Sequence, residues 1–493
     1  MENIFDLIGT ALVSVLTWQT LLIILIGIIY GILAGAIPGI SASIAVALLV
    51  PFTYNLDPSQ AMILLTTVYG ASSYGGSITA IMINTPGTPG SVVTTFDGYP
   101  LTRQGKPGLA LGTSIISSAS GGIFGTIILI IFSVPIAKLA LSFGPPEYFA
   151  LAILGLTIIS SLSSDNLIKG LIATLLGLLL TTVGVDPFTG FPRFTFGMSE
   201  LGDGFAFIPA LIGLFAIGEV LIQAENFIPK SKVIDQFSKQ FPNWKMIRKL
   251  WKVIIKSSIV GTIIGAIPGA GGTVATFIAY DQAKKSSKSP EQFGKGSLEG
   301  VAAPEAANNA AVGGALIPLL TLGIPGSASS AVLIGALFMH GLVPGPELFI
   351  KQSDLVYGLF AALLIANIFM LIIGWWGNRL FVKVIAIPPA ILLAIIPAFA
   401  VVGSYTINRS IFDVGTCICF GILGWLLKRN NIPTAPVVLG LILGFMVEAN
   451  LRRTLLMGDY TLLFTRPISA AMLILAIVSF IYPFMRKRKT PLI

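Results

Sequence analysis

A nine-residue pattern, G-x-x-x-G-A-I-P-G, occurs twice in this chain, and it constrains the fold more than any other feature. The copies run from Gly31 to Gly39 and from Gly261 to Gly269, in opposite halves of a 493-residue chain. Proline and glycine in this order, inside an apolar stretch, interrupt a helix. Interruptions at matching places in two halves are typical of the binding site of a membrane transporter. We therefore predict two related halves, each with an interrupted membrane helix.

The composition supports a membrane protein. Hydrophobic residues make up 55% of the chain and charged residues only 10%, whereas a soluble protein carries about 25% charged residues. Many apolar runs are long enough to cross a bilayer. The start of the chain lacks the basic region and cleavage site of a signal peptide, so we expect no processing. The predicted class is an all-α polytopic membrane protein with no sizeable soluble domain.

Other functional classes find little support in the sequence. The net charge of +9 fits cationic cytoplasmic loops better than nucleic-acid binding. Cys417 and Cys419 lie in an apolar run and are expected to be small buried residues. His340 has no acidic or thiol neighbour with which to build a metal site. The motifs HExxH, Walker A and GxSxG do not occur, so we expect no enzyme, no ATP-driven step and no cofactor or metal beyond a transient coupling Na⁺ or H⁺.

The distribution of charge predicts the organisation of the chain. Lysine and arginine gather in one hydrophilic interval near the middle and in the C-terminal tail, and both should be cytoplasmic. We therefore divide the chain into a first transmembrane repeat (1–224), a basic cytoplasmic linker (225–252), a second transmembrane repeat (253–451), and an additional C-terminal helix with a basic tail (452–493). The N-terminus is expected outside and the C-terminus in the cytoplasm.

The apolar runs predict two re-entrant hairpins and about 11 crossings. The hairpins cover 18–54 and 253–281, and each is centred on one copy of the Pro-Gly pattern. The crossings are predicted at 59–84, 108–141, 147–163, 167–185 and 205–224, then at 301–323, 355–384, 386–404, 411–427, 435–451 and 468–485. Because five crossings separate the hairpins, they enter from opposite faces, and the repeats have inverted topology.

A second Pro-Gly break follows later in each half. It is the segment Asn84–Gly87 in the first half and Gly323–Gly326 in the second. Glycine, serine and threonine follow all four breaks, where half-helices should begin. Free N–H groups and the positive end of the helix dipole at such a point suit an anion, especially a carboxylate. Close helix packing by small residues is the alternative, and for four breaks in a duplicated pattern we favour the site.

These arguments define the predicted site. The predicted substrate-binding residues are Gly39, Ser41, Ser43, Thr85, Gly87, Thr88, Gly269, Gly271, Gly272, Thr273, Asn308, Asn309, Gly326 and Ser327. Coupling of a cation or proton is assigned to Glu305, Asn308 and Asn84, because a carboxylate and amides on one face of an intramembrane helix are costly without a function. Glu219 and Glu448, late in apolar spans, are open alternatives for the coupling residue.

Four segments of the chain are similar in sequence to a known family. They are GAIPGISASIAVALLVPFTY, INTPGTPGSV, AIPGAGGTVATFIAYDQ and FGKGSLEGVAAPEAANNAAVGGALIPLLTLGIPGSASS. Over at least residues 20–450 the chain closely resembles the large permease subunit of tripartite tricarboxylate transporters. The resemblance implies a secondary transporter (a symporter) of the bacterial inner membrane. It also implies a periplasmic substrate-binding protein and a small transmembrane subunit as partners, with citrate, other tricarboxylates or related carboxylates as substrates.

Two other functions remain open from the sequence. One is an autonomous carboxylate carrier that needs no binding protein, which transport by the chain alone in liposomes would reveal. The other is a passive organic-anion channel, for which flux would neither saturate nor depend on a cation gradient. A membrane-embedded enzyme is a remote third, because the catalytic motifs are missing.

Overall fold

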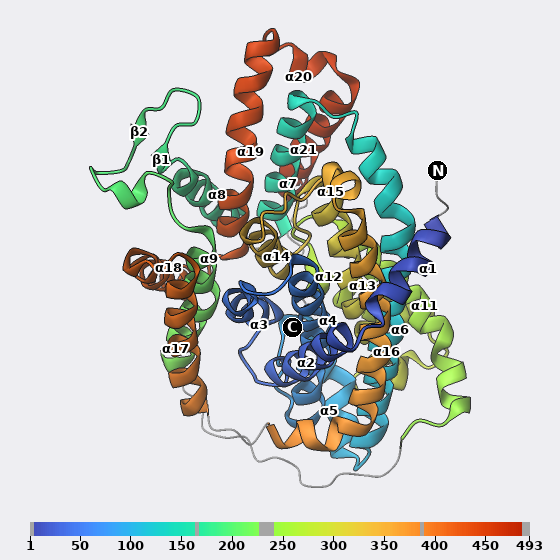
Figure 1. The fold of residues 1–493 in the computed structure, drawn as a ribbon. Coiled ribbons are helices and arrows are strands. Elements are labelled where there is room, and N and C mark those ends of the chain that lie inside the picture. The colour runs from blue at the N-terminus through green and yellow to red at the C-terminus, as the bar shows by residue number, and fades with distance from the viewer. Residues whose placement is uncertain (1–3, 163–166, 226–240, 385–388, 486–493) are drawn as a thin grey trace.

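The computed structural model describes residues 4–162, 167–225, 241–384 and 389–485, and nearly all of its regular structure is helical (Figure 1). The exception is an antiparallel hairpin of two short strands, β1 (Gly184–Val185) and β2 (Pro192–Arg193). The predicted all-helical class is confirmed. Parts of the predicted basic linker (226–240) and of the basic tail (486–493) lie outside the described residues.

Six helices in the described chain are long and apolar enough to cross a membrane, judged by length and composition. They are α2 (Trp18–Gly35), α6 (Pro107–Ala140), the continuous run α9–η4–α10 (Phe207–Glu225), α16 (Ser353–Val384), α18 (Ile411–Arg429) and α19 (Ala435–Met457). Shorter apolar helices accompany them: α3 (Ala42–Leu49) with the 3₁₀ turn η1 (Val50–Thr53), α7 (Pro145–Leu162), α8 (Leu167–Thr181), α14 (Ala328–Met339), α17 (Pro389–Asn408) and α21 (Pro467–Met485). The set is that of a multi-pass membrane protein.

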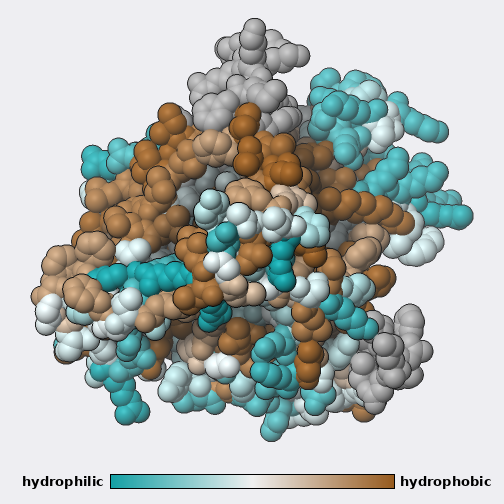
Figure 2. Space-filling view, turned by 90° about the horizontal axis from the view of Figure 1, so that it is seen from above, coloured by the Kyte–Doolittle hydropathy of each residue, from teal (hydrophilic) through white to brown (hydrophobic). Residues whose placement is uncertain are grey.

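The outer surface is suited to lipid. Large apolar side chains such as Leu175, Ile263 and Ile474 are about 60% exposed to the surroundings, which would be unfavourable in water over so wide an area. On the face seen in Figure 2, broad hydrophobic areas lie beside groups of hydrophilic residues. The exposed apolar side chains therefore belong to the part of the surface that contacts the bilayer.

Two central helices, α4 (Pro58–Ile83) and α13 (Leu298–Leu322), are buried along almost their whole length. Both occupy predicted crossings, but neither is among the six most apolar spans. Other helices surround them: α2 packs on α4, α11 (Trp244–Ala266) packs on α13, and α6 also packs on α13. A helix enclosed by protein needs small residues for close packing rather than large apolar ones. Serine, threonine, glycine and alanine accordingly make up half of α4, and alanine is the commonest residue of α13.

The glycines of the G-x-x-x-G part of the repeated pattern pack these helices together. A Cβ at Gly35 would collide with the backbone of Ser72 in α4, and a Cβ at Gly265 would lie 2.5 Å from the carbonyl oxygen of Ala311 in α13. The two glycines are at equivalent places in the two copies. The G-x-x-x-G part of the pattern is therefore a helix-packing element of the small-xxx-small type.

The Pro-Gly part of the pattern ends a helix. Gly39 and Gly269 have φ values of +91° and +77°, a conformation that side chains other than glycine rarely adopt. Helix α2 ends at Gly35, before Gly39, and α12 (Gly271–Ser286) begins after Gly269. At the second breaks, α4 and α13 end on the left-handed caps Asn84 and Gly323. A helix therefore ends at each of the four predicted interruptions.

Some predicted boundaries are wrong. Helix α11 begins at Trp244, inside the interval predicted as linker, because Asn243 caps it and the apolar face of its first turns buries Leu250 and Ile254. The crossing predicted at 167–185 ends earlier, at Thr181, and leads into the β-hairpin. The prediction also lacked several short helices: α1 (Ile4–Val15), α5 (Thr95–Arg103), α15 (Pro346–Lys351) and α20 (Leu462–Thr465).

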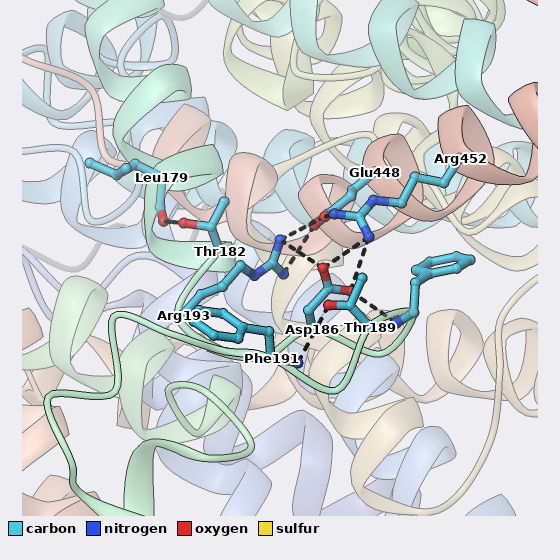
Figure 3. A network of polar contacts seen from close by, with 9 residues as sticks. Leu179, Thr182, Asp186, Thr189, Phe191, Arg193, Glu448 and Arg452 are labelled. Carbon is cyan, nitrogen blue, oxygen red and sulfur yellow. Dashed lines mark hydrogen bonds and ion pairs between the residues drawn. The ribbon is translucent and has the colours of Figure 1, made fainter.

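The β-hairpin is tied to α19 by ion pairs (Figure 3). Arg193 of β2 and Arg452 of α19 each place a guanidinium nitrogen 2.7 Å from Oε1 of Glu448. Arg452 also reaches Asp186 of the hairpin at 2.9 Å. The hydrogen bond from the backbone N–H of Phe188 is the main cause that lowers the pKa of Asp186 to about 2, and the hydrogen bond from Arg452 lowers it further. The hairpin is thus held by a carboxylate that stays ionised at neutral pH.

Candidate functional site

Segments that follow all four helix breaks meet around one cavity of about 210 Å³. These segments are far apart in sequence, and the cavity joins them. Its lining residues are Ser41, Ala42 and Ser43 after the first break; Thr88, Pro89 and Gly90 after the second; Gly269, Ala270, Gly271, Gly272 and Thr273 at the third; and Ser327, Ala328 and Ser329 after the fourth; with Tyr69, Ser73, Asn308 and Ala435. The cavity is large enough for a small organic molecule.

The helix starts at this cavity differ in how they are capped. The side chain of Ser41 accepts a hydrogen bond from the N–H of Ile44 at the start of α3 (3.4 Å). Ser327 and Ser330 cap each other at the start of α14. Helix α12 follows Ala270, whose methyl group cannot accept a hydrogen bond. Among these three helix starts, α12 therefore offers the least satisfied N–H groups and the most accessible positive dipole end.

Asn308 connects two of the breaks. Its Nδ2 donates to the carbonyl oxygen of Ser73 in α4 at 3.2 Å. A Cβ at Gly272 would lie 2.6 Å from its Oδ1, and a Cβ at Gly90 would collide with the same oxygen. The amide therefore fits between two glycines that no larger residue could replace without moving it. The hydroxyl groups of Tyr69 and Ser327, which also line the cavity, are hydrogen-bonded at 2.9 Å.

The cavity wall is polar but neutral. Among the described residues that line it, none carries a formal charge. Lys295, which precedes α13 and could have met an anion, is exposed in a loop. A bound carboxylate would thus be held by N–H groups, hydroxyls and helix dipoles, as at other helix N-termini that bind anions, and its charge would remain without a protein cation beside it.

Several predicted site residues lie away from the cavity lining. Gly39 faces the side chain of Gln223, Gly87 packs on the backbone of Gly35, and Gly326 packs on the backbone of Gly265. Asn84 is the left-handed cap of α4, and the hydroxyl of Thr85 donates to the carbonyl of Ile83. Structural needs explain why these residue types occur at these positions: a positive φ at Gly39 and Asn84, close backbone packing at Gly87 and Gly326, and a local turn at Thr85. The remaining predicted residues, apart from Glu305 and Asn309, line the cavity.

Glu305 occupies a separate, closed polar pocket. Its side chain is fully buried and accepts four hydroxyl hydrogen bonds. Ser77 and Thr94 donate to Oε1 at 2.5 Å each. Ser114 and Ser118 of α6 donate to Oε2 at 2.9 and 2.8 Å. The hydroxyls come from α4, α6 and the start of α5, so this carboxylate joins three elements around α13.

The other two acidic candidates form ion pairs. Glu219 in α10 lies 2.6 Å from the ammonium nitrogen of Lys428 in α18, and Glu448 belongs to the hairpin network with Arg193 and Arg452. Intramembrane acids with cationic partners are satisfied by those partners. Both contacts favour a role in holding helices together over a role in coupling.

Sequence reasoning missed part of the cavity and one buried acid. Tyr69, Ser73, Gly90 and Ser329 line the cavity but are not among the predicted site residues. Asp97 in α5 is fully buried, and its Oδ1 accepts the N–H groups of Gly294, Gly296 and Ser297 at 2.7–2.9 Å. The alternating glycines of FGKGS, which allow successive N–H groups to converge on an anion, were the available signal.

Known sequences resemble this chain over most of its length. The sequence model of the tripartite tricarboxylate transporter TctA family matches residues 21–439. The chain is 39% identical over 450 residues to an uncharacterized 52.8 kDa protein in the TAR-I ttuC′ 3′ region of Agrobacterium vitis, covering 91% of this chain and 90% of that one. An uncharacterized protein in the TAR-II ttuC′ 3′ region of Agrobacterium vitis is 42% identical over 220 residues, covering 44% of this chain and 91% of that one.

Proposed function

The chain belongs to the tripartite tricarboxylate transporter TctA family, and we propose that it takes up tricarboxylates or related carboxylates across the bacterial inner membrane by cation-coupled secondary transport. Membership makes the chain a multi-pass membrane component of a tripartite transport system and not an enzyme. The proposed partners are a periplasmic substrate-binding protein, which delivers the carboxylate, and a small transmembrane subunit.

The proposed transport unit is a pair of inverted repeats. The order helix, Pro-Gly break, half-helix, central helix occurs as α2–α3–α4 and again as α11–α12–α13. The packing glycines Gly35 and Gly265 contact the central helix of their own half. Helix α6 of the first half packs on α13, and α16 of the second half packs on α4. Such an arrangement suits transporters in which one repeat moves against the other around a fixed site.

The substrate is proposed to bind in the 210 Å³ cavity. A carboxylate would accept hydrogen bonds from the uncapped N–H groups at Gly271–Thr273 and from the hydroxyl of Thr273. Ser43, Ser329 and Tyr69 would contact the rest of the molecule. Since the wall is neutral, a co-transported cation would offset the charge of the substrate, which supports cation coupling.

The observation that carries the proposal is the convergence of four helix breaks on one cavity. The test is uptake of radiolabelled citrate, other tricarboxylates and dicarboxylates by cells that express the chain with its binding protein and small subunit. We expect Thr273→Val and Asn308→Leu to reduce uptake about tenfold or more, since one interaction worth about 1.4 kcal/mol is a factor of ten.

Thr321→Val is the matched control for this test. Thr321 is a fully buried threonine in α13 that donates to the carbonyl of Ile317 and lines neither described cavity. Carboxylate uptake by the Thr321→Val variant should equal uptake by the wild type. Uptake that is unchanged in Thr273→Val and Asn308→Leu, at equal amounts of inserted protein, would exclude this cavity as the substrate site. Uptake that neither saturates nor depends on a cation gradient would favour a channel.

A further inference from the structure

A second, much smaller cavity lies between α4, α6, α13 and α16. Its volume is about 20 Å³, which is the space that one water molecule or one small ion needs. The polar side chains that line it are Thr66 and Thr67 of α4, Thr126 of α6, Asn309 of α13 and Asn367 of α16. They come from all four helices, so the cavity lies at a point where the two halves of the chain meet.

Two of these side chains have no hydrogen-bond partner. The hydroxyl of Thr67 and both amide atoms of Asn309 are buried without one, and Asn309 is only 1% exposed. A buried polar group without a partner costs about 1–3 kcal/mol. Two of the three atoms are oxygens, Oγ1 of Thr67 and Oδ1 of Asn309, and they indicate a bound species that coordinates them; Nδ2 of Asn309 is a donor, which a cation does not satisfy.

The chemistry of the lining favours a cation. The hydroxyl of Thr66 donates to the backbone carbonyl of Met62 at 2.7 Å, and that of Thr126 donates to the carbonyl of Gly122 at 2.8 Å. The amide nitrogen of Asn367 donates to the carbonyl of Leu363 at 2.8 Å. Because these protons are already used, the three side chains have oxygen lone pairs left to offer the cavity. With the oxygens of Thr67 and Asn309, the wall supplies hard oxygen ligands, the type that alkali and alkaline-earth cations prefer.

A buried carboxyl group, that of Glu305, lies one helical turn away. Glu305 and Asn309 are four residues apart in α13, so they share a face about 6 Å apart along the helix axis. The residues of α6 that face them follow the same spacing: Ser114 and Ser118 contact Glu305, and Gly122 and Thr126 line the small cavity. A cation in the cavity would be attracted by the buried carboxylate, which makes no ion pair among the described residues.

We propose that this cavity binds one Na⁺-sized monovalent cation through the oxygen atoms of Thr66, Thr67, Thr126, Asn309 and Asn367, with Glu305 as the nearby counter-charge. The proposal rests on the cation coupling proposed above and assigns it to a place. It separates the coupling ion from the substrate cavity: Asn308 faces the large cavity, and its neighbour Asn309 faces the small one. Helix α13, which carries both residues, links the two sites.

The test measures ion binding by the purified full chain in lipid nanodiscs, without substrate or partners. Thermal unfolding is followed as NaCl replaces choline chloride at constant ionic strength, and binding of ²²Na⁺ is measured directly. A ligand that binds only the folded state raises its stability as the concentration exceeds the dissociation constant. We expect a saturable rise in Tm with Na⁺ for the wild type and saturable ²²Na⁺ binding.

Substitutions locate the effect. Thr126→Val and Asn309→Leu should raise the Na⁺ concentration at half-effect at least tenfold, whereas Thr126→Ser, which keeps the hydroxyl, should retain the response. Thr321→Val is the control: both threonines are buried and donate to the carbonyl four residues earlier, but only Thr126 lines the cavity. Thr321→Val should respond to Na⁺ as the wild type does.

Two results would overturn the proposal. A wild-type chain with no Na⁺-dependent Tm and no ²²Na⁺ binding would mean that the cavity holds only water. An equal Na⁺ response in the wild type, Thr126→Val and Asn309→Leu would place the ion elsewhere. Neither result bears on carboxylate uptake. If uptake depends on a proton gradient and is abolished by Asn308→Leu, the proposed function stands although the Na⁺ site does not exist.

Discussion

At the scale of single residues, the buried carboxylate of Asp97 holds a loop in place. It accepts three backbone N–H groups from residues 294–297 and the hydroxyl of Tyr280 at 2.8 Å. That loop leads directly into α13, the helix that carries Asn308 and Asn309. Asp97 therefore fixes the start of a central helix from a segment that lies in the other half of the chain.

Replacing this side chain should destabilise the protein. Asp97→Ala leaves three N–H groups without an acceptor, one of them that of the buried Ser297, and we expect a loss of about 3 kcal/mol in the free energy of unfolding. Asp281→Ala is the control, since Asp281 makes an exposed i,i+4 pair with Lys285, and such pairs contribute little. Thermal unfolding in detergent measures both. Equal Tm values for the two variants would contradict this role of Asp97.

Residue-level prediction from sequence reached its limit at α13. The segment Glu305–Asn309 was correctly identified as a polar group in a buried helix, because such residues are rare and costly there. The sequence places its polar residues on one face of the helix, with Asn308 and Asn309 assigned to substrate binding and Glu305 and Asn308 to coupling. In the structure Asn308 lines the large cavity, Asn309 lines the small one, and Glu305 meets hydroxyls of three neighbouring elements. Neighbouring residues in a helix point about 100° apart, so their partners depend on which helices pack around them, and that is tertiary information.

At the scale of elements, the repeated pattern combines two functions. Its G-x-x-x-G part brings α2 against α4 and α11 against α13, and its Pro-Gly part ends α2 and α11. Close packing and interruption therefore follow each other within nine residues. This places the start of each following half-helix, α3 and α12, beside the central helix and at the large cavity.

The packing contact can be tested by adding one methyl group. Gly35→Ala would bring a Cβ into the backbone of Ser72, and overpacking of this kind costs about 1–3 kcal/mol. Gly415→Ala in α18 is the matched control, since its Cβ would meet no atom within 4 Å. We expect a lower Tm and a lower yield of folded protein for Gly35→Ala only. A Tm equal to that of the control would show that α2 and α4 can separate without cost.

The β-hairpin should loosen in acid. Four charged groups face one another in its anchor: Asp186, Arg193, Glu448 and Arg452 (Figure 3). The pKa of Asp186, held near 2, is below the usual value for aspartate, about 3.9. The stabilisation is therefore complete above about pH 4 and is lost as the pH falls through 2.

Pepsin digestion measures this loss, because the hairpin segment carries the exposed residues Phe191, Phe194 and Phe196. At pH 4 we expect the wild type to be cut in the hairpin more slowly than Asp186→Asn, which lacks the ion pair at every pH. The difference should shrink as the pH approaches 2. Equal rates at pH 4 would mean that the anchor does not control the hairpin.

The long apolar helices and the helix breaks are the features that the sequence predicts best. The long apolar crossings and all four breaks follow from local signals, namely apolar run length and the placement of proline and glycine. Helix α11 was predicted to start too late, because its first turns are basic and only one face is apolar. Helix α5 is short and contains Pro100, so nothing in its local sequence distinguishes it from a loop. Its stability comes from contacts with α4, α6 and α13.

At the scale of the whole molecule, the two halves interlock. Helix α6 packs on α13 and α16 packs on α4, so each central helix is covered by a helix from the opposite half. The large cavity is lined by both halves as well. A relative movement of the halves would change access to the cavity, which is what alternating access in a repeat-based transporter requires.

The central claim is that the transported carboxylate binds where the four breaks meet, and substrate protection of a cysteine tests it most directly. Cys417 and Cys419 are first replaced by serine, and Thr273→Cys is introduced at the uncapped start of α12; Ser287→Cys, beyond the end of α12 and outside the cavity lining, is the control. Both are labelled with a maleimide, with and without the carboxylate that the cells take up. We predict that this carboxylate slows labelling at position 273 severalfold and leaves position 287 unchanged. Labelling at 273 that is unaffected by a saturating concentration of a transported carboxylate would contradict the account.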